Sequence, residues 1–193
     1  MSTSRILIAL SAVGLLTACA FNPQSAKIAP NVEVATGDVG KGVTVAFRVV
    51  DERSSKSLGN RGTAYGKAAE ISAADDVSAV VHEKIAEGLK RKGYAVTDYN
   101  ENASPRLSVE LRSLEYGTST GFWTGGVKVQ AALKGVATRD GKVYEKMYRS
   151  EKENRVVVVP TAEKNQEWIN AGLTDVLTQV FDDIGLFRHL SAQ

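Results

Sequence analysis

The chain contains few of the residues that stabilise or equip small exported proteins: one cysteine, four prolines and two histidines among 193 residues. The single cysteine, Cys19, excludes an intrachain disulfide, so the core alone must stabilise the folded part. Two isolated histidines and one cysteine do not supply the ligands of a zinc site. We therefore expect no metal and no cofactor.

An excess of charge is also missing. Lysine and arginine total 24 and aspartate and glutamate 22, which gives a formal net charge of +2 at pH 7. Removal of residues 1–18, in which Arg5 is the only charged residue, lowers it to +1. Nucleic-acid-binding domains need a basic surface, so this balance predicts no nucleic-acid partner.

The N-terminus has the pattern of a secretory leader. Arg5 precedes an apolar stretch from Ile6 to Leu16, which as a helix would span roughly 16 Å, about half a bilayer core. The stretch ends in Leu16-Thr17-Ala18-Cys19, which resembles the lipobox of bacterial lipoproteins. We predict a signal peptide over residues 1–18 and acylation of Cys19. Ordinary cleavage that leaves a free thiol is the alternative.

Acylated Cys19 is predicted to hold the chain on a membrane. One acyl chain binds a bilayer marginally, whereas two or three bind it stably, at about 0.8 kcal/mol per buried methylene. Resemblance to the lipoprotein class implies three chains. Ala20 stands where an aspartate, in that class, signals retention in the inner membrane. We therefore expect the outer membrane, with the protein facing the periplasm.

Two parts are expected in the exported chain. Residues 19–41 contain two prolines and two glycines without sustained periodicity, which predicts a flexible tether, although Val32 and Val34 allow a short edge strand. Residues 42–193 follow as one periplasmic domain without internal repeats. A chain of about 150 residues buries roughly two-thirds of its unfolded surface, which is enough for a core.

The first half of this domain begins with a strand and a helix. Alternating apolar residues predict a strand over 43–49. A loop rich in glycine and serine, 54–70, separates it from a helix that begins after Ser72 and ends before Gly93. A short strand over 94–97 is expected next.

Strands and a second helix fill the other half. Residues 107–111 and 127–133 alternate, and Asp140-Gly141 predicts a type I′ turn into a strand over 142–153. Counting outward from the turn pairs Leu133 with Tyr148 and Ala137 with Tyr144. Thr161 is the expected N-cap of a final helix, whose apolar stripe runs from Ile169 to Ile184 and lies opposite polar residues that include Asn170 and Thr174.

The order strand–helix–strand–strand–strand–strand–helix predicts an α+β fold. The first crossover should be right-handed and bring two strands parallel, in a mixed, mostly antiparallel sheet. Each helix has one apolar stripe, so we expect both amphipathic helices to pack on the sheet.

Candidate catalytic groups are scarce. Only His82 and His189 could serve as histidine bases, the first at the solvent edge of a helix and the second near the C-terminus, so no enzyme is expected. Residues 62–68 lack the spacing of a phosphate loop and are predicted to be a surface loop. Asp51 and Arg53 are expected to form an ion pair that ties down the long loop.

Two apolar features lie outside this pattern. Phe122 and Trp123 stand in a loop of small residues, 117–126, and either fold back under the sheet or form an exposed contact for a partner or a bilayer. Residues 156–159 are four consecutive valines before Pro160, which predicts an edge strand that continues into the core.

Taken with the lipobox, four segments of the chain resemble the YajG-like bacterial lipoprotein family: Gly42–Val45, Asp51–Arg53, Lys92–Val96 and Leu173–Leu177. The resemblance covers most of the exported chain and implies a small envelope lipoprotein with an interaction role. It also implies a layout similar to the amino-terminal domain of TolB.

These observations lead to two hypotheses. The first is a non-enzymatic, outer-membrane-anchored accessory protein that contacts an envelope protein. The second is a periplasmic binding module for a glycan or peptide fragment, with its cleft beside loop 54–70. The sequence does not indicate the oligomeric state.

Overall fold

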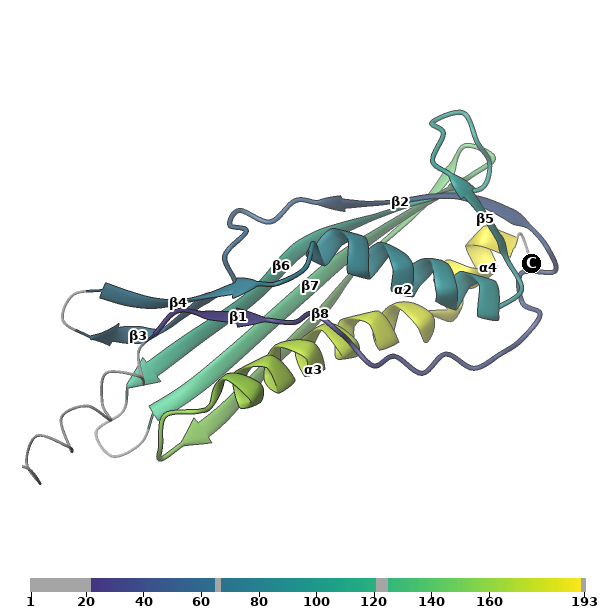
Figure 1. Ribbon diagram of the computed structural model, residues 1–193. Coiled ribbons are helices and arrows are strands. Elements are labelled where there is room, and N and C mark those ends of the chain that lie inside the picture. The colour runs from purple at the N-terminus through teal and green to yellow at the C-terminus, as the bar shows by residue number, and fades with distance from the viewer. Residues whose placement is uncertain (1–21, 65–66, 121–124, 192–193) are drawn as a thin grey trace, which may run out of the picture.

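The computed structural model describes residues 22–64, 67–120 and 125–191. Within them, one mixed sheet of eight strands carries three helices, which confirms the predicted α+β fold (Figure 1). In chain order the elements are β1 (Gln24–Ala26), β2 (Thr44–Asp51), β3 (Gly59–Ala64), β4 (Lys67–Ala73), α2 (Val77–Arg91), β5 (Ala95–Asp98), β6 (Arg106–Thr120), β7 (Gly125–Arg139), β8 (Lys142–Val156), α3 (Ala162–Phe181) and α4 (Ile184–Ser191).

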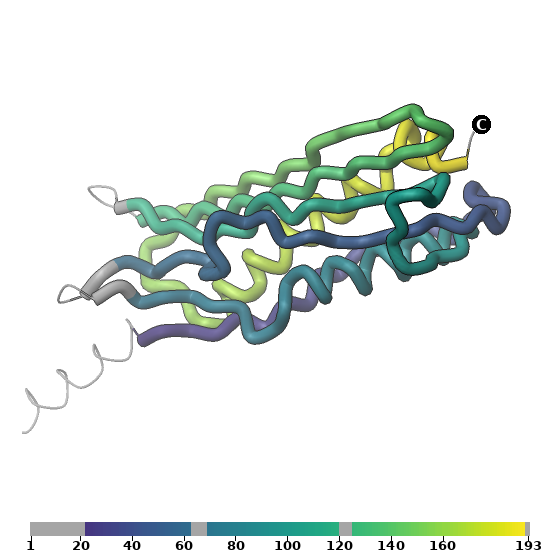
Figure 2. The backbone as a smooth tube through the Cα atoms, turned by 90° about the horizontal axis from the view of Figure 1, so that it is seen from above, coloured from purple at the N-terminus to yellow at the C-terminus, as the bar shows by residue number. Residues whose placement is uncertain are grey.

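Three antiparallel strands of 15 residues each, β6, β7 and β8, run the length of the molecule (Figure 2). Asp140 and Gly141 have φ values of 50° and 75°, as the type I′ turn requires. Leu133 pairs with Tyr148 and Ala137 with Tyr144, so the register counted from the turn is confirmed.

The other edge of β6 has two partners. β2 runs parallel to its first half and carries β5 on its far side, while β3 reaches β6 only where Gly59 meets Tyr116. Gly59 has a φ of 132°, and a Cβ there would lie 1.8 Å from the Tyr116 carbonyl oxygen. Only glycine allows this approach.

The predicted loop 54–70 is wrong over most of its length, because β3 and much of β4 lie within it as a hairpin. The β3 sequence GNRGTA has no apolar alternation, so its pattern does not reveal a strand. The loop predicted over 117–126 is likewise shorter, since β6 extends to Thr120 and β7 begins at Gly125.

The helices α2 and α3 lie side by side on one face of the sheet (Figure 1). Asp76, rather than Ser72, is the N-cap of α2, and Thr161 caps α3 as predicted. Gly88 lets the helices approach closely, because a Cβ there would lie 2.1 Å from Cε1 of Phe181. Ile184 is 72% exposed, since α3 ends at Phe181 and a new helix, α4, begins.

The flexible tether predicted over residues 19–41 is wrong for residues 22–41, which we call the N-terminal segment. Its strand β1 pairs with β4, and Ala26, Ile28 and Val34 are buried in the core. The packed part of the chain therefore begins at residue 22 instead of near Gly42.

Candidate functional site

The N-terminal segment is held by hydrogen bonds along α3. The backbone N–H groups of Lys27, Ala29 and Asn31 donate to Gln166 Oε1 at 2.8 Å, Asn170 Oδ1 at 2.8 Å and Thr174 Oγ1 at 3.1 Å, respectively. Four helical residues rise about 6 Å and two extended residues about 6.6 Å, so the two spacings match. The segment is therefore fixed to the domain along this length.

A buried polar chain continues this attachment at β1. Asn165, which is 1% exposed, donates from Nδ2 to Gln24 Oε1 at 2.9 Å and accepts from the Tyr116 hydroxyl at 2.7 Å. Burial raises the pKa of Tyr116 to about 12, so its hydroxyl keeps its proton and remains a donor at neutral pH.

Arg61 joins the first described residue to the end of the sheet. Its Nη1 donates to the Asn22 carbonyl oxygen at 3.4 Å and its Nη2 to the Pro160 carbonyl oxygen at 3.1 Å. Asn22 and the end of β8 therefore lie together although about 140 residues separate them in the chain. We call the surface formed by Asn22, Thr120, Gly125 and Val156–Pro160 the Asn22 end.

The Asn22 end is apolar and open. Val157, Val158 and Val159 are 85%, 75% and 50% exposed. With the neighbouring ends of β6, β7 and β8 they line a groove of about 440 Å³. The predicted continuation of this run into the core is wrong: β8 ends at Val156, opposite Gly125 where β7 begins, and Pro160 then turns the chain into α3.

The residues predicted for attachment and partner contact belong to parts of the sequence next to this end. Cys19, and likewise Phe122 and Trp123, lie outside the described residues. Cys19 precedes Asn22 by three positions, and the two aromatic residues stand between Thr120 and Gly125. None of the described helices combines the length and apolar character needed to cross a membrane.

The predicted ion pair at the end of β2 is present. Nε and Nη2 of Arg53 donate to the Asp51 carboxylate at 2.9 and 2.8 Å, and Lys56 Nζ lies 2.9 Å from Asp51 Oδ2. The hydrogen bonds from Arg53, followed by Lys56, hold the pKa of the Asp51 carboxyl well below its usual range although burial opposes them.

A polar cavity of about 570 Å³ lies beside this pair, and its wall includes Glu70, Asp75 and Asp76. Two of these acids already have partners, because Asp75 Oδ2 accepts from Ile28 N at 2.9 Å and Asp76 caps α2. The cavity therefore stands where the second hypothesis places a cleft, but much of its charge is used within the fold.

The histidines are separate from each other. The exposed His82 stacks on Phe47 with ring centroids 4.8 Å apart. His189 lies on α4, with Nε2 3.2 Å from the Lys142 carbonyl oxygen. Among the described residues, no group of three or more His, Cys, Asp or Glu could hold a metal ion.

Geometry and fold together define one α+β domain whose N-terminal segment is fixed at an exposed apolar end. The chain belongs to a lipoprotein family: a family model described as "Uncharacterized lipoprotein" matches residues 30–190. A comparison with curated proteins gave no match.

Solved structures similar to this chain share its fold. Protein XCC0632 from Xanthomonas campestris is 13% identical with a TM-score of 0.56, over 88% of this chain and 97% of that one. A putative neuraminyllactose-binding hemagglutinin homolog from Helicobacter pylori is 11% identical with a TM-score of 0.46, over 85% and 97%. Lipoprotein GNA1162 from Neisseria meningitidis is 14% identical with a TM-score of 0.33, over 72% and 97%.

Proposed function

We propose that the protein is an outer-membrane lipoprotein of the YajG-like group, attached by acyl chains on Cys19, with its domain in the periplasm. There it acts as a non-enzymatic interaction or accessory protein of the cell envelope. One observation carries the attachment: a lipobox cysteine stands three residues before Asn22, which Arg61 holds at one end of the domain. The family match to lipoproteins supports it.

The Cys19→Ser variant tests the attachment. We expect it to leave the membrane fraction or to accumulate unprocessed, because the acyl chains supply the proposed attachment. Ala20→Asp is the matched control: it should stay acylated and membrane-bound but move to the inner membrane. Fractionation on a density gradient separates these results, and a processed Cys19→Ser protein that stays fully membrane-bound contradicts the proposal.

The described histidine contacts support a non-enzymatic role. General-base catalysis needs a histidine held against a nucleophile or a substrate proton. The recorded contacts of His82 and His189 are instead a phenylalanine ring and a backbone carbonyl.

A partner protein is expected to use Phe122 and Trp123. Replacing both with Ser should leave the melting temperature almost unchanged but reduce recovery of an envelope protein with the acylated chain, because exposed aromatic residues dominate interface energies. A fall of the melting temperature by roughly 10 °C would instead show that they are core residues. Circular dichroism and cross-linked pull-down measure the two effects.

The second candidate is a binding module for a glycan or peptide fragment. It is favoured by the polar cavity of about 570 Å³ beside Asp51 and Glu70. Saturable binding of a cell-wall muropeptide, lost on Glu70→Gln and without protein recovered in the pull-down, would favour this function over the first.

A further inference from the structure

The three valines at the end of β8 are exposed as a group. Other exposed large apolar residues, such as Val143 and Ile184, stand singly, and single ones are normal on protein surfaces. A contiguous apolar patch instead marks a contact surface. Val157–Val159 therefore need an occupant in the cell.

The position of Asn22 identifies that occupant. Arg61 holds the carbonyl oxygens of Asn22 and Pro160 on one guanidinium group, so the chain leading to Cys19 starts next to the valines. Each extended residue spans at most about 3.6 Å, so Cys19 lies within roughly 11 Å of Asn22. An acylated Cys19 would therefore bring the bilayer surface to the valines.

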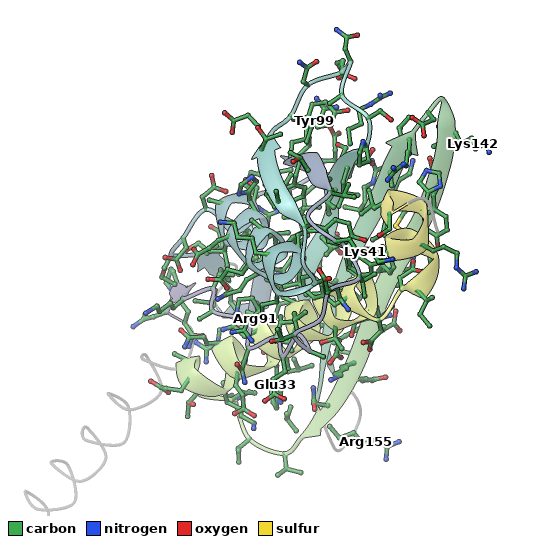
Figure 3. The ribbon with its side chains drawn as sticks, turned by 90° about the vertical axis from the view of Figure 1, so that its right-hand side faces the viewer. Glu33, Lys41, Arg91, Tyr99, Lys142 and Arg155 are labelled. Carbon is green, nitrogen blue, oxygen red and sulfur yellow. The ribbon has the colours of Figure 1, made fainter. Side chains whose placement is uncertain are left out.

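We propose that Val157–Val159 are a second membrane contact, which enters the apolar surface of the same bilayer that holds the acyl chains. This proposal rests on the proposed acylation of Cys19. Arg155 extends from the same end of β8, where a cation suits lipid phosphates, while Lys142 marks the opposite end (Figure 3). The acyl anchor holds the valines at a high local concentration near lipid, so even a weak contact is occupied.

Two attachment points would fix the orientation of the domain. Strands of 15 residues extend about 50 Å, and the described part of β6–β8 runs from the Asn22 end to the Asp140-Gly141 turn. The turn and α4 would then stand about 50 Å out in the periplasm, at the end that Figure 1 shows opposite the start of β1. A domain held on a free tether would have no such fixed orientation.

Lipid-borne quenching tests the contact in the full acylated protein. Cys19 is blocked by its acyl chain, so Val158→Cys supplies a single thiol for a bimane label, and Val143→Cys, also an exposed valine, is the matched control at the far turn. In vesicles of phosphatidylethanolamine and phosphatidylglycerol that contain doxyl lipid, we expect at least threefold stronger quenching at position 158 than at 143.

The outcomes separate this contact from the anchor, because co-sedimentation with the vesicles reports the anchor and quenching reports the valines. Co-sedimentation with equal quenching at both positions overturns the membrane contact and leaves the anchor intact. A label at 158 that is protected from iodide but insensitive to doxyl lipid shows that protein covers the valines, and also overturns it. Absence of co-sedimentation overturns both proposals.

Discussion

A chain that begins at Gly42 is expected to lose its cooperative fold, or to melt at least roughly 10 °C below a chain that begins at Asn22. The N-terminal segment supplies core residues as well as hydrogen bonds. Ile28 and Val34 are 3% and 8% exposed, and each large apolar side chain contributes about 1.5–3 kcal/mol on burial. The whole domain is expected to have only about 5–15 kcal/mol of stability.

The segment also satisfies backbone groups elsewhere in the fold. The carbonyl oxygens of Arg91 and Lys92, at the C-terminal end of α2, accept from Gly37 N at 2.9 Å and from Gly40 N at 2.8 Å. Residues at a helix C-terminus have no partners within the helix for these oxygens. Removing the segment therefore exposes core surface and also frays α2.

Thermal melts followed by circular dichroism measure this effect. Two point variants in the full exported chain separate packing from length: Ile28→Ala should cost about 2–5 kcal/mol, whereas Glu33→Ala, on the exposed side of the same segment, should cost almost nothing. Coincident melts of the chains that begin at Asn22 and Gly42 would show that the segment is only loosely attached.

Local signals explain what the sequence predicted well. The Asp140-Gly141 turn sets the register of β7 and β8 through residues at the turn itself, and the stripe of α3 repeats within one helix. The edge strand β1 depends instead on a partner almost 50 residues away, where Gln24 pairs with Ile71. Alternation does run from Ala26 to Val34, but prolines and glycines around it concealed the pattern.

The candidate site shows the same limit. The polar residues Asn170 and Thr174 follow the pattern of a solvated helix face, and nothing in the helix sequence distinguishes a side chain that faces water from one that binds a backbone. The valine run has the composition of a core strand, yet it extends past the last residue of β7 that could pair with it. Both depend on where distant chain ends meet, which periodicity does not encode.

A buried carboxylate at the opposite end of the domain joins three elements. Asp183, whose side chain is 4% exposed, accepts from the Tyr148 hydroxyl at 2.7 Å and the Tyr144 hydroxyl at 2.9 Å, and lies 3.2 Å from Lys146 Nζ. Its other oxygen accepts from Gly185 N at 3.0 Å and Leu186 N at 3.2 Å, which caps α4. Asp183 thus connects β8 to the junction of α3 and α4.

These donors decide its protonation. Burial alone would raise the pKa of Asp183, but hydrogen bonds from Tyr148, Tyr144, the Leu186 N–H and Lys146 together lower it. A carboxyl whose folded pKa lies below its unfolded value, about 3.9, adds stability that is present above that value. This stability is lost as the pH falls through the folded pKa.

Asp183→Ala is therefore expected to lower stability at pH 7 by about 3–5 kcal/mol, or the melting temperature by roughly 10 °C, because it leaves the buried Tyr148 hydroxyl without its acceptor. Asp182→Ala, an exposed neighbour, is the control and should change little. Asp183→Asn keeps an acceptor without the charge, so its deficit relative to the wild type should shrink as the pH falls below about 4. Urea melts at pH 7, 5 and 3 measure both effects, and a deficit of Asp183→Asn that does not vary with pH would show that the carboxylate charge contributes nothing to the fold.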